Sequence, residues 1–308
     1  MNIRTMIDEI NQVYLGNPTV VELCVTSLLA NGHVLLEDVP GTGKTMLAKT
    51  LATSFHGDFS RIQFTADLLP SDIVGSDFFN LKTQEFENKQ GPIFANIVLI
   101  DEINRAVPRT QSALLEAMEE RQVTVGGKTY HLPTPFFVIA TQNPIESSGT
   151  FSLPDAQLDR FMMCLHTGYP TEEFELQLLE ESVTETRKAV LANVDFEQLL
   201  QYRADAMKIH VSKDILRYIV SIATASRSHR NVQTGISPRA TIALSKAAQS
   251  YAYIQSRDYV TPEDIKFLAP YVFAHRLTLT LEGEIKSSKA MVMEEILATV
   301  PVPVEMGM

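Results

Sequence analysis

The sequence predicts an α/β fold: a parallel, three-layer core built around a phosphate-binding loop, followed by an all-α domain. Two observations predict the core, because residues 38–45 read DVPGTGKT after an apolar run and residues 98–102 read VLIDE. A third predicts the helical domain, because almost everything after Pro170 has helical spacing. We therefore expect a core over residues 1–168 and a helical lid over residues 169–308.

The segment DVPGTGKT has the context of a phosphate-binding loop. An apolar run over residues 33–36 predicts a strand before it, and MLAKTLATSF predicts a helix after it. Gly41 and Gly43 lack side chains, so the backbone can wrap a phosphate and point its N–H groups inward at the positive end of the helix. Asp38 departs from the strict motif, which has glycine there. A chance glycine-rich turn is the alternative.

The residues after these glycines complete the expected site for a nucleoside triphosphate. Lys44 supplies a point charge for the β- and γ-phosphates, and the hydroxyl of Thr45 is available to Mg²⁺. We expect Pro40, Thr42 and Met46 to contact the nucleotide as well.

Two acidic residues end the next buried strand. Residues 96–100 are apolar enough for a central strand, and they place Asp101 and Glu102 at its carboxyl end, where open α/β sheets bind ligands. We expect Asp101 to hold Mg²⁺, directly or through water, and Glu102 to polarise the water that attacks the γ-phosphate. A solvated strand end is the alternative.

The remaining elements follow from apolar runs and helix caps. Besides residues 33–36 and 96–100, we expect strands over residues 60–65, 136–141 and 161–167. Residues 168–170 then break the chain. Helices of the second domain are expected to begin at the cap residues Thr171, Ser212, Ser237 and Thr261.

Three further segments have recognisable patterns. The first residues, MNIRTMIDEINQVY, alternate charged and apolar side chains and predict an amphipathic helix. Residues 121–135 alternate on either side of Gly126 and Gly127, which favours a hairpin, and residues 78–94 favour a second one. A surface loop is the alternative for both.

Composition excludes several classes of protein. The net charge of −11 and the isoelectric point of about 5.1 oppose general binding to nucleic acid or to an anionic membrane. Cys24 and Cys164 are far apart in apolar contexts, as expected of reduced core residues in a cytoplasmic protein. We find no membrane-spanning run and no signal peptide, and the histidines have no metal-ligand spacing.

These segments resemble the MoxR family of AAA+ ATPases. The blocks that resemble the family's signatures, in the same order, are LLEDVPGTGKT, GPIFANIVLIDEINRA, RTQSALLEAMEERQVTV, FFVIATQNPIE, GTFSLPDAQLDRF and GISPRAT. They run from residue 35 to 241, and VPVP near the end is also similar, so the resemblance covers nearly the whole chain.

The resemblance implies three further site residues. Asn143 follows an apolar strand and would orient the attacking water, although an Asn-Pro turn is the alternative from sequence alone. Arg160 matches the arginine finger that reaches the γ-phosphate held by a neighbouring subunit; its alternative is an ion pair with Asp155 or Asp159.

The third residue, Arg239, matches the lid arginine that couples lid position to nucleotide state, with a plain solvated arginine as its alternative. The resemblance also implies contacts of Tyr14, Leu15 and Gly16 with adenine, although YLGN at residues 14–17 departs from the family's usual pattern.

What the resemblance implies overall is a Mg²⁺-dependent ATPase that forms a ring, a homo-hexamer, and remodels or matures client proteins. Metal or cofactor insertion is one form of that activity, and a protein with a von Willebrand factor A domain is the expected partner. GTP is disfavoured because Asn88 and Lys89 are not followed by the acid of an NKxD motif. A nucleic-acid motor and a nucleotide-gated binding switch with little turnover stay open as alternatives.

Overall fold

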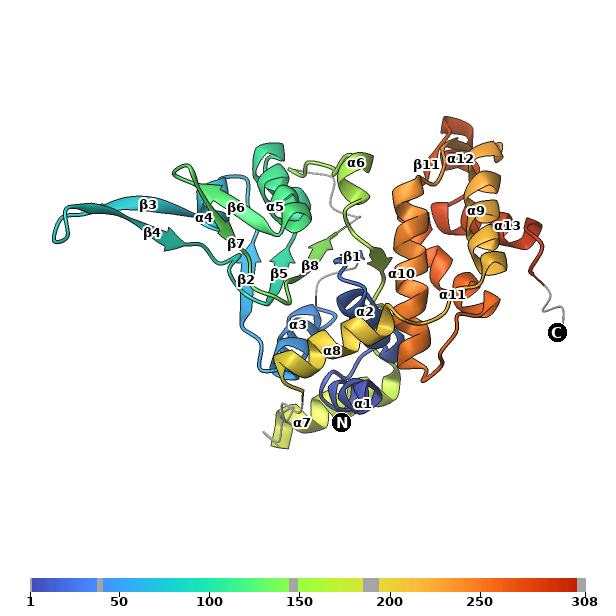
Figure 1. Ribbon diagram of the computed structural model, residues 1–308, viewed down its shortest axis with the longest axis horizontal. Helices are drawn as coiled ribbons and strands as arrows, with labels where there is room; N and C mark the ends of the chain where they lie inside the picture. Colours follow the sequence, from blue (N-terminus) through green and yellow to red (C-terminus); the bar gives the residue numbers. More distant parts are fainter. Residues whose placement is uncertain (1, 38–40, 144–148, 185–193, 304–308) are drawn as a thin grey trace. The chain divides into compact units, whose positions relative to one another are not determined.

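The structure, a computed structural model, describes residues 2–37, 41–143, 149–184 and 194–303, and it contains two compact units (Figure 1). Unit one consists of Met1–Glu22, His33–Arg160 and Leu165–Leu199, and unit two of Leu23–Gly32, Phe161–Cys164 and Leu200–Met308. The chain therefore passes between the units several times, and the single division expected at residue 168 stays a prediction.

The central sheet has the strand order β2-β5-β8-β1-β9. Its strands are β1 (Val34–Glu37), β2 (Phe59–Gln63), β5 (Ile97–Asp101), β8 (Phe137–Gln142) and β9 (Met163–Leu165). The pairs β2–β5, β5–β8 and β8–β1 are all parallel. The predicted α/β fold with a parallel sheet is confirmed, although β9 is shorter than the strand expected over residues 161–167.

The register of the sheet decides where polar groups collect. Gln63 of β2 lies opposite Asp101 of β5, and Thr141 of β8 lies opposite Leu36 of β1. In parallel strands the carboxyl ends share one edge, so the polar residue that ends each buried run lies at that edge. In both β5 and β8 every residue before the last one is buried, and this burial fixes the register.

Helices surround the sheet in unit one. They are α1 (Ile3–Val13), α3 (Lys44–Thr53), α4 (Pro70–Val74), the 3₁₀ turn η1 (Ile103–Arg105), α5 (Pro108–Glu120), α6 (Asp155–Leu158) and α7 (Glu172–Thr184). Helix α3 packs on β2 and β5, and α1 packs on α3. The amphipathic helix predicted at the start is confirmed as α1, whose N-terminus is capped by the Asn2 side chain.

Two helices contain residues of both units. They are α2 (Pro18–Leu29) and α8 (Phe196–Ala206). In α2 the division falls after Glu22, and in α8 it falls after Leu199.

Both predicted hairpins are present. One is formed by β6 (Gln122–Val125) and β7 (Lys128–His131), with Gly126 and Gly127 at φ 57° and 78° in the two-residue turn between them. The other is formed by β3 (Gly75–Asn80) and β4 (Glu85–Gln90). In Figure 1 this second hairpin extends far from the rest of unit one, and we call it the arm.

Unit two is mainly helical. It contains α9 (Lys213–Ser228), α10 (Pro238–Ile254), α11 (Pro262–Phe273), the 3₁₀ turn η2 (Ala274–Arg276), α12 (Leu281–Lys286), α13 (Lys289–Thr299) and a small sheet of β10 (Val232–Thr234) with β11 (Thr278–Leu279). Three of the four predicted caps lie in this unit and are confirmed, because the side chains of Ser212, Ser237 and Thr261 accept hydrogen bonds from the first turns of α9, α10 and α11. The fourth, Thr171, precedes α7 of unit one, and its hydroxyl accepts from the Phe174 N–H at 3.4 Å.

Two expectations from composition can be compared with this fold. Within the described ranges, no helix is both long and apolar enough to span a membrane. Cys24 and Cys164 are both free thiols and both buried, as predicted.

Burial makes Cys24 unreactive. It raises the pKa of this thiol from 9.0 to about 12, so only about one molecule in ten thousand carries the thiolate at pH 8. We expect the native protein to leave Cys24 unmodified by Ellman's reagent at pH 8 and the protein in guanidinium chloride to react rapidly at the same position. Rapid labelling of Cys24 in the native protein, located by peptide mass, would contradict this packing.

Candidate functional site

Two cavities of unit one, each of about 250 Å³, meet at the loop Gly41–Gly43, which lines both of them. We call them the apolar cavity and the polar cavity. The apolar cavity is lined by Val13, Tyr14, Leu15, Gly16, Gly41, Thr42, Gly43, Met46, Thr167, Gly168, Pro170, Leu178 and Glu181. The polar cavity is lined by Gly41, Thr42, Gly43, Lys44, Thr45, Arg61, Gln63, Asp101, Glu102, Thr141, Gln142 and Asn143.

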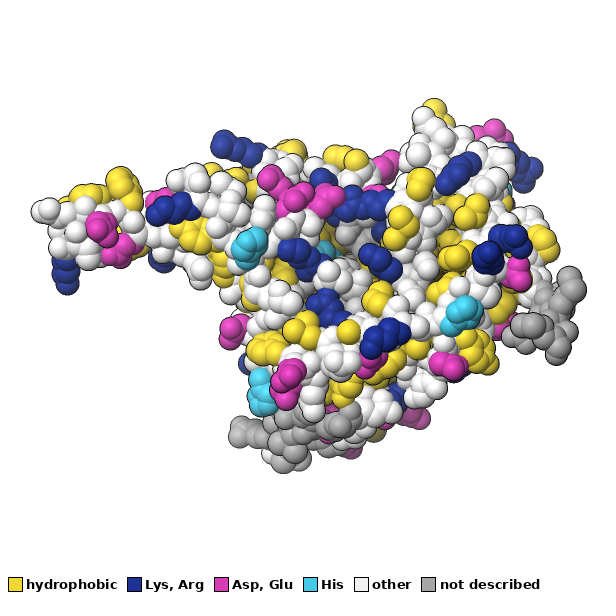
Figure 2. All heavy atoms as spheres, in the orientation of Figure 1, with side chains coloured by type: hydrophobic (Ala, Val, Ile, Leu, Met, Phe, Trp, Pro, Cys, Tyr) yellow, Lys and Arg dark blue, Asp and Glu magenta, His cyan; other side chains and the backbone are white. Residues whose placement is uncertain are grey.

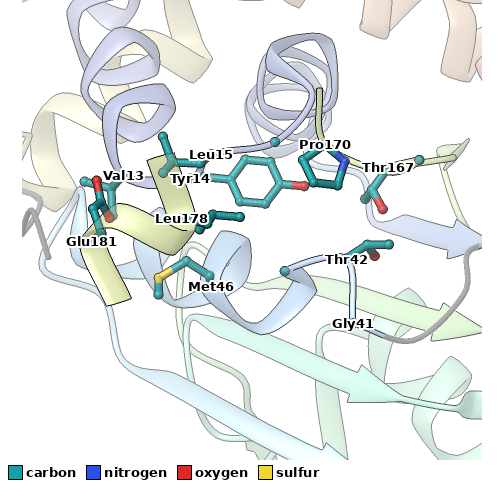
Figure 3. Close-up of a pocket in the computed structure, with 13 residues that line it drawn as sticks. Val13, Tyr14, Leu15, Gly41, Thr42, Met46, Thr167, Pro170, Leu178 and Glu181 are labelled. Atoms are coloured by element: carbon teal, nitrogen blue, oxygen red, sulfur yellow. The ribbon is translucent and has the colours of Figure 1, made fainter. Parts of the chain in front are cut away.

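The Tyr14 ring forms one wall of the apolar cavity (Figure 3). Tyr14 directly follows the last residue of α1, and its ring lies against two glycines. A Cβ added to Gly16 would come within 2.5 Å of the ring, and a Cβ added to Gly43 would lie 3.3 Å from it. Met46 of α3 and Leu178 of α7 point into the same space in Figure 3. A flat, mostly apolar space of this kind suits a planar heteroaromatic base.

The loop between the cavities ends at the first turn of α3. Gly43 adopts φ 82° and ψ 14°, a left-handed conformation that a side chain would strain, and no side chain caps the helix there. The buried Oγ1 of Thr42 has no hydrogen-bond partner in the part of the chain that the structure describes. An anion at this helix end would accept from the open N–H groups and from that hydroxyl. Pro40, expected to contact nucleotide, lies outside the described residues.

Lys44 and Thr45, the first residues of α3, line the polar cavity together with Asp101. Asp101 ends β5 and forms an ion pair with Arg61 of β2, with 2.5 Å between Oδ2 and Nε. The carboxylate is 13% exposed and the arginine 52%, so the arginine lies on the solvent side of the pair.

Glu102 follows Asp101 in a left-handed conformation, φ 57° and ψ 53°. A residue with a side chain adopts this conformation only where its surroundings hold it. Its backbone N–H donates to Thr141 Oγ1 at 3.0 Å, the Gln63 amide donates to its Oε2 at 2.7 Å, and Arg105 Nε lies 3.2 Å from the same oxygen. Residues from β2, β8 and η1 thus fix both its backbone and its carboxylate.

Asn143 follows β8 and lines the polar cavity with Glu102, which is where the sequence placed it. Its neighbour Gln142 donates to the carboxylate of Glu37 at the end of β1. The carboxyl ends of four adjacent strands therefore contribute to this one region of polar side chains.

The two arginines predicted from the resemblance lie elsewhere. Arg160 pairs with Glu119 of α5, with 2.8 Å between Nε and Oε2, and the two side chains are 28% and 34% exposed. The expected alternative partners were Asp155 and Asp159, but the ion pair formed is with α5. Arg239 belongs to unit two, where it is exposed at the second position of α10, as its place after Ser237 and Pro238 predicted.

Sequence reasoning assigned no role to four polar side chains of this region: Arg61, Gln63, Arg105 and Thr141. Arg61 and Gln63 belong to an edge strand whose alternation of polar and apolar residues resembles an ordinary half-exposed strand. Only the register, which places Gln63 opposite Asp101, shows that they face the acids.

The polar cavity combines the groups that phosphoryl transfer uses. It offers backbone N–H groups and Lys44 to a polyphosphate, a hydroxyl and a carboxylate to a cation, and a second carboxylate to water. No cluster of three or more His, Cys, Asp or Glu that could hold a metal occurs among the described residues. The donor set of Thr45 and Asp101 suits Mg²⁺, which commonly binds one or two protein oxygens together with substrate phosphates.

Comparisons with known proteins agree with this geometry. Residues 33–163 match the family model described as "ATPase family associated with various cellular activities (AAA)", and residues 224–296 match the AAA lid domain. A crystal structure of a protein from Cytophaga hutchinsonii superposes with a TM-score of 0.92 at 40% identity, covering 98% of this chain and 95% of the other.

Several relatives match almost the whole chain. YeaC of Bacillus subtilis is 50% identical over 97% of this chain and 94% of its own length. Chaperone MoxR1 of Mycobacterium tuberculosis is 42% identical, covering 96% and 81%, and Protein MoxR of Paracoccus denitrificans is 30% identical, covering 96% and 94%. With its phosphate-binding loop, its paired acids and its helical lid, the chain belongs to the MoxR family of AAA+ ATPases.

Proposed function

We propose that this chain hydrolyses ATP with Mg²⁺ in a ring and uses the energy to remodel client proteins. One observation carries the catalytic part: the apolar and polar cavities share the loop Gly41–Gly43. A molecule with a flat base at one end and a polyphosphate at the other would occupy both cavities at once, with the base against Tyr14 and Met46 and the phosphates over the start of α3. Leu15 and Gly16 complete the base contacts.

On this proposal the chain's own residues divide the work. Lys44 neutralises phosphate charge, while Thr45 and Asp101 hold Mg²⁺, which when bound neutralises charge on the phosphate oxygens. Glu102 accepts a proton from the attacking water, and Asn143, in the same cavity, orients that water. Gln63 and Arg105 keep the Glu102 carboxylate oriented, since both contact its Oε2.

We assign Arg160 to the site of a neighbouring subunit. It is not among the described residues that line either cavity, and its ion pair with Glu119 is partly exposed. Such pairs stabilise by only about 0–1 kcal/mol, so phosphate can replace Glu119 at little cost. Stabilisation of transition-state charge by Arg160 would make turnover depend on assembly into a ring, for which the family resemblance suggests a homo-hexamer. Arg239 is proposed to report lid position to the nucleotide.

The proposed output is chaperone-like maturation of other proteins. The relative from Mycobacterium tuberculosis is named a chaperone, and the family resemblance suggests metal or cofactor insertion together with a partner that has a von Willebrand factor A domain. The two free, buried thiols support a cytoplasmic location.

The arm is the proposed contact with the client. Its exposed apolar side chains are Phe78, Phe79, Leu81 and Phe86, with Phe79 and Phe86 packed edge to face at 5.3 Å. Figure 2 shows hydrophobic side chains gathered at the outer end of the arm. Exposed apolar groups collected on one element are typical of surfaces that bind other proteins.

The first prediction concerns turnover. Glu102→Gln keeps the shape of the side chain but removes the proton acceptor, so we expect normal ATP affinity with hydrolysis slower by roughly 10²–10⁴-fold. Lys44→Ala is the matched variant in the loop, and it should lose ATP binding itself. Calorimetry with ATP and a phosphate-release assay measure the two effects. If Glu102→Gln hydrolysed ATP at a substantial native rate, Glu102 would not be the proton acceptor. If the native protein and Glu102→Gln both hydrolysed ATP at an equal, negligible rate, a nucleotide-gated binding switch would be favoured.

The second prediction concerns the base. Gly16→Ala places a methyl group inside the contact distance of the Tyr14 ring, which should weaken ATP binding and lower the free energy of unfolding by about 1–3 kcal/mol. In a Tyr14→Ala background the same change should have almost no effect on either quantity, because the clash is gone. Calorimetry and denaturant unfolding measure this double-mutant cycle. Additive losses would show that Gly16 acts independently of the ring.

The third prediction concerns the arm. Leu81→Ser should leave basal ATP hydrolysis unchanged and abolish most of the ATP-dependent suppression of aggregation of a probe client, reduced α-lactalbumin, followed by light scattering. Leu281→Ser on α12 is the control, because both leucines are 83% exposed. Equal suppression by the two variants would contradict client binding at the arm.

A further inference from the structure

Directly after Arg160, the chain passes from unit one to unit two. Arg160 is the last residue of the segment His33–Arg160, which packs in unit one, and Phe161–Cys164 packs in unit two. The backbone that carries the proposed arginine finger is therefore attached on its C-terminal side to the helical unit.

Two side chains of η2 hold that segment by its backbone. Arg276 donates from Nη2 to the Phe161 carbonyl at 2.7 Å and from Nη1 to the Met162 carbonyl at 3.1 Å. His275 Nε2 lies 3.2 Å from the same Phe161 carbonyl. Arg276 Nη1 also donates to the carbonyl of Val272 on α11, so the guanidinium links the segment to this helix.

These hydrogen bonds are buried. Arg276 is 8% exposed and the Phe161 side chain is fully buried, so the carbonyls have little access to water. Burial, reinforced by the charge of Arg276, holds the pKa of His275 well below its usual range, and the neutral imidazole can donate from Nε2 to the carbonyl. Breaking buried bonds of this kind leaves polar groups unpaired and away from water, so the segment is held firmly.

By comparison, the side chain of Arg160 is held weakly. Its ion pair with Glu119 is partly exposed, and its backbone N–H donates to Gln157 at 3.2 Å. On its N-terminal side the residue continues the hydrogen-bonded turn that ends α6. On its C-terminal side its position depends on the backbone at Phe161 and Met162, which Arg276 holds.

We propose that Arg276, supported by His275, is a positioning residue for the arginine finger: it fixes the backbone at Phe161 and Met162, so that movement of the helical unit moves Arg160. This inference rests on the proposed role of Arg160 in a neighbouring subunit. Neither His275 nor Arg276 touches the nucleotide in this role. A subunit without the Arg276 contacts keeps a working site of its own and becomes a poor donor of its finger.

The test uses mixed assemblies of full-length variants. Arg276→Met alone should bind ATP like the native chain but hydrolyse it roughly 10–100-fold more slowly, because a misplacement of about 1 Å has a cost of that order. Mixed with Lys44→Ala subunits, which have a native finger but no ATP site, it should recover hydrolysis. Mixed with Arg160→Ala subunits, whose sites are intact but whose finger is missing, it should recover none.

Three controls make the result specific. Arg257→Met removes a second arginine of unit two, whose side chain is 26% exposed; it pairs with Asp264 at 2.6 Å and makes no bond to residues 161–162 among those described. It should still donate a finger to Arg160→Ala subunits. Arg276→Lys keeps the positive charge but lacks the planar guanidinium that bonds to two carbonyls, so it should behave like Arg276→Met. It replaces Arg276→Met in the test if the methionine variant unfolds. Arg160→Ala mixed with Lys44→Ala must recover hydrolysis.

The outcomes separate the inference from the proposal beneath it. No recovery in the mixture of Arg160→Ala with Lys44→Ala would overturn action in trans, and this inference with it. Recovery in that mixture, together with recovery when the Arg276 variants are mixed with Arg160→Ala, would overturn the positioning role alone. Loss of donation in Arg257→Met as well would reduce the effect to general damage of unit two.

Discussion

The parallel register of the central sheet is the constraint on which the site depends. It aligns the carboxyl ends of β2, β5, β8 and β1, so Gln63, Asp101 and Thr141 lie at one edge although the sequence separates them widely. The buried apolar side chains of β5 and β8 stabilise these strands, so the fold does not depend on the polar groups at this edge for its stability. A slip of one residue in β5 would turn Asp101 to the other face and bring an apolar side chain to the edge.

The loop Gly41–Gly43 lies between the two cavities that the proposed nucleotide would fill. It separates a space walled by Tyr14 from a space that contains two carboxylates, and it is thin because its glycines carry no side chains. Tyr14 could not lie against Gly43 if that residue had a larger side chain, since even a Cβ would lie 3.3 Å from the ring. In the proposed binding mode Gly43 therefore has two uses: its positive φ shapes the loop for phosphate, and its lack of a side chain leaves room for the Tyr14 ring beside the base.

Much of this could be predicted from the sequence. The buried strands β1, β5 and β8 were visible as apolar runs, the turn Gly126–Gly127 identified one hairpin, and cap residues located three helices of unit two. The contacts around Glu102 could not be predicted, because they join β2, β8 and η1 and depend on register. The ion pair of Arg160 was also predicted wrongly. Local spacing suggested Asp155 or Asp159 as the partner, but the fold brings Glu119 of α5 close instead.

The position of β9 was predicted but its length was not, and the hydrogen bonds just before the strand give a physical reason. Residues 161–167 are apolar enough for a longer strand, yet the strand covers only Met163–Leu165. The carbonyls of Phe161 and Met162 accept hydrogen bonds from Arg276, and that of Phe161 also from His275. A carbonyl satisfied by a buried guanidinium gains at least as much as one in a sheet, because bonds to charged donors are the stronger ones. The carbonyls of Phe161 and Met162 thus bond to η2 rather than extend β9, and these bonds attach the backbone after Arg160 to unit two.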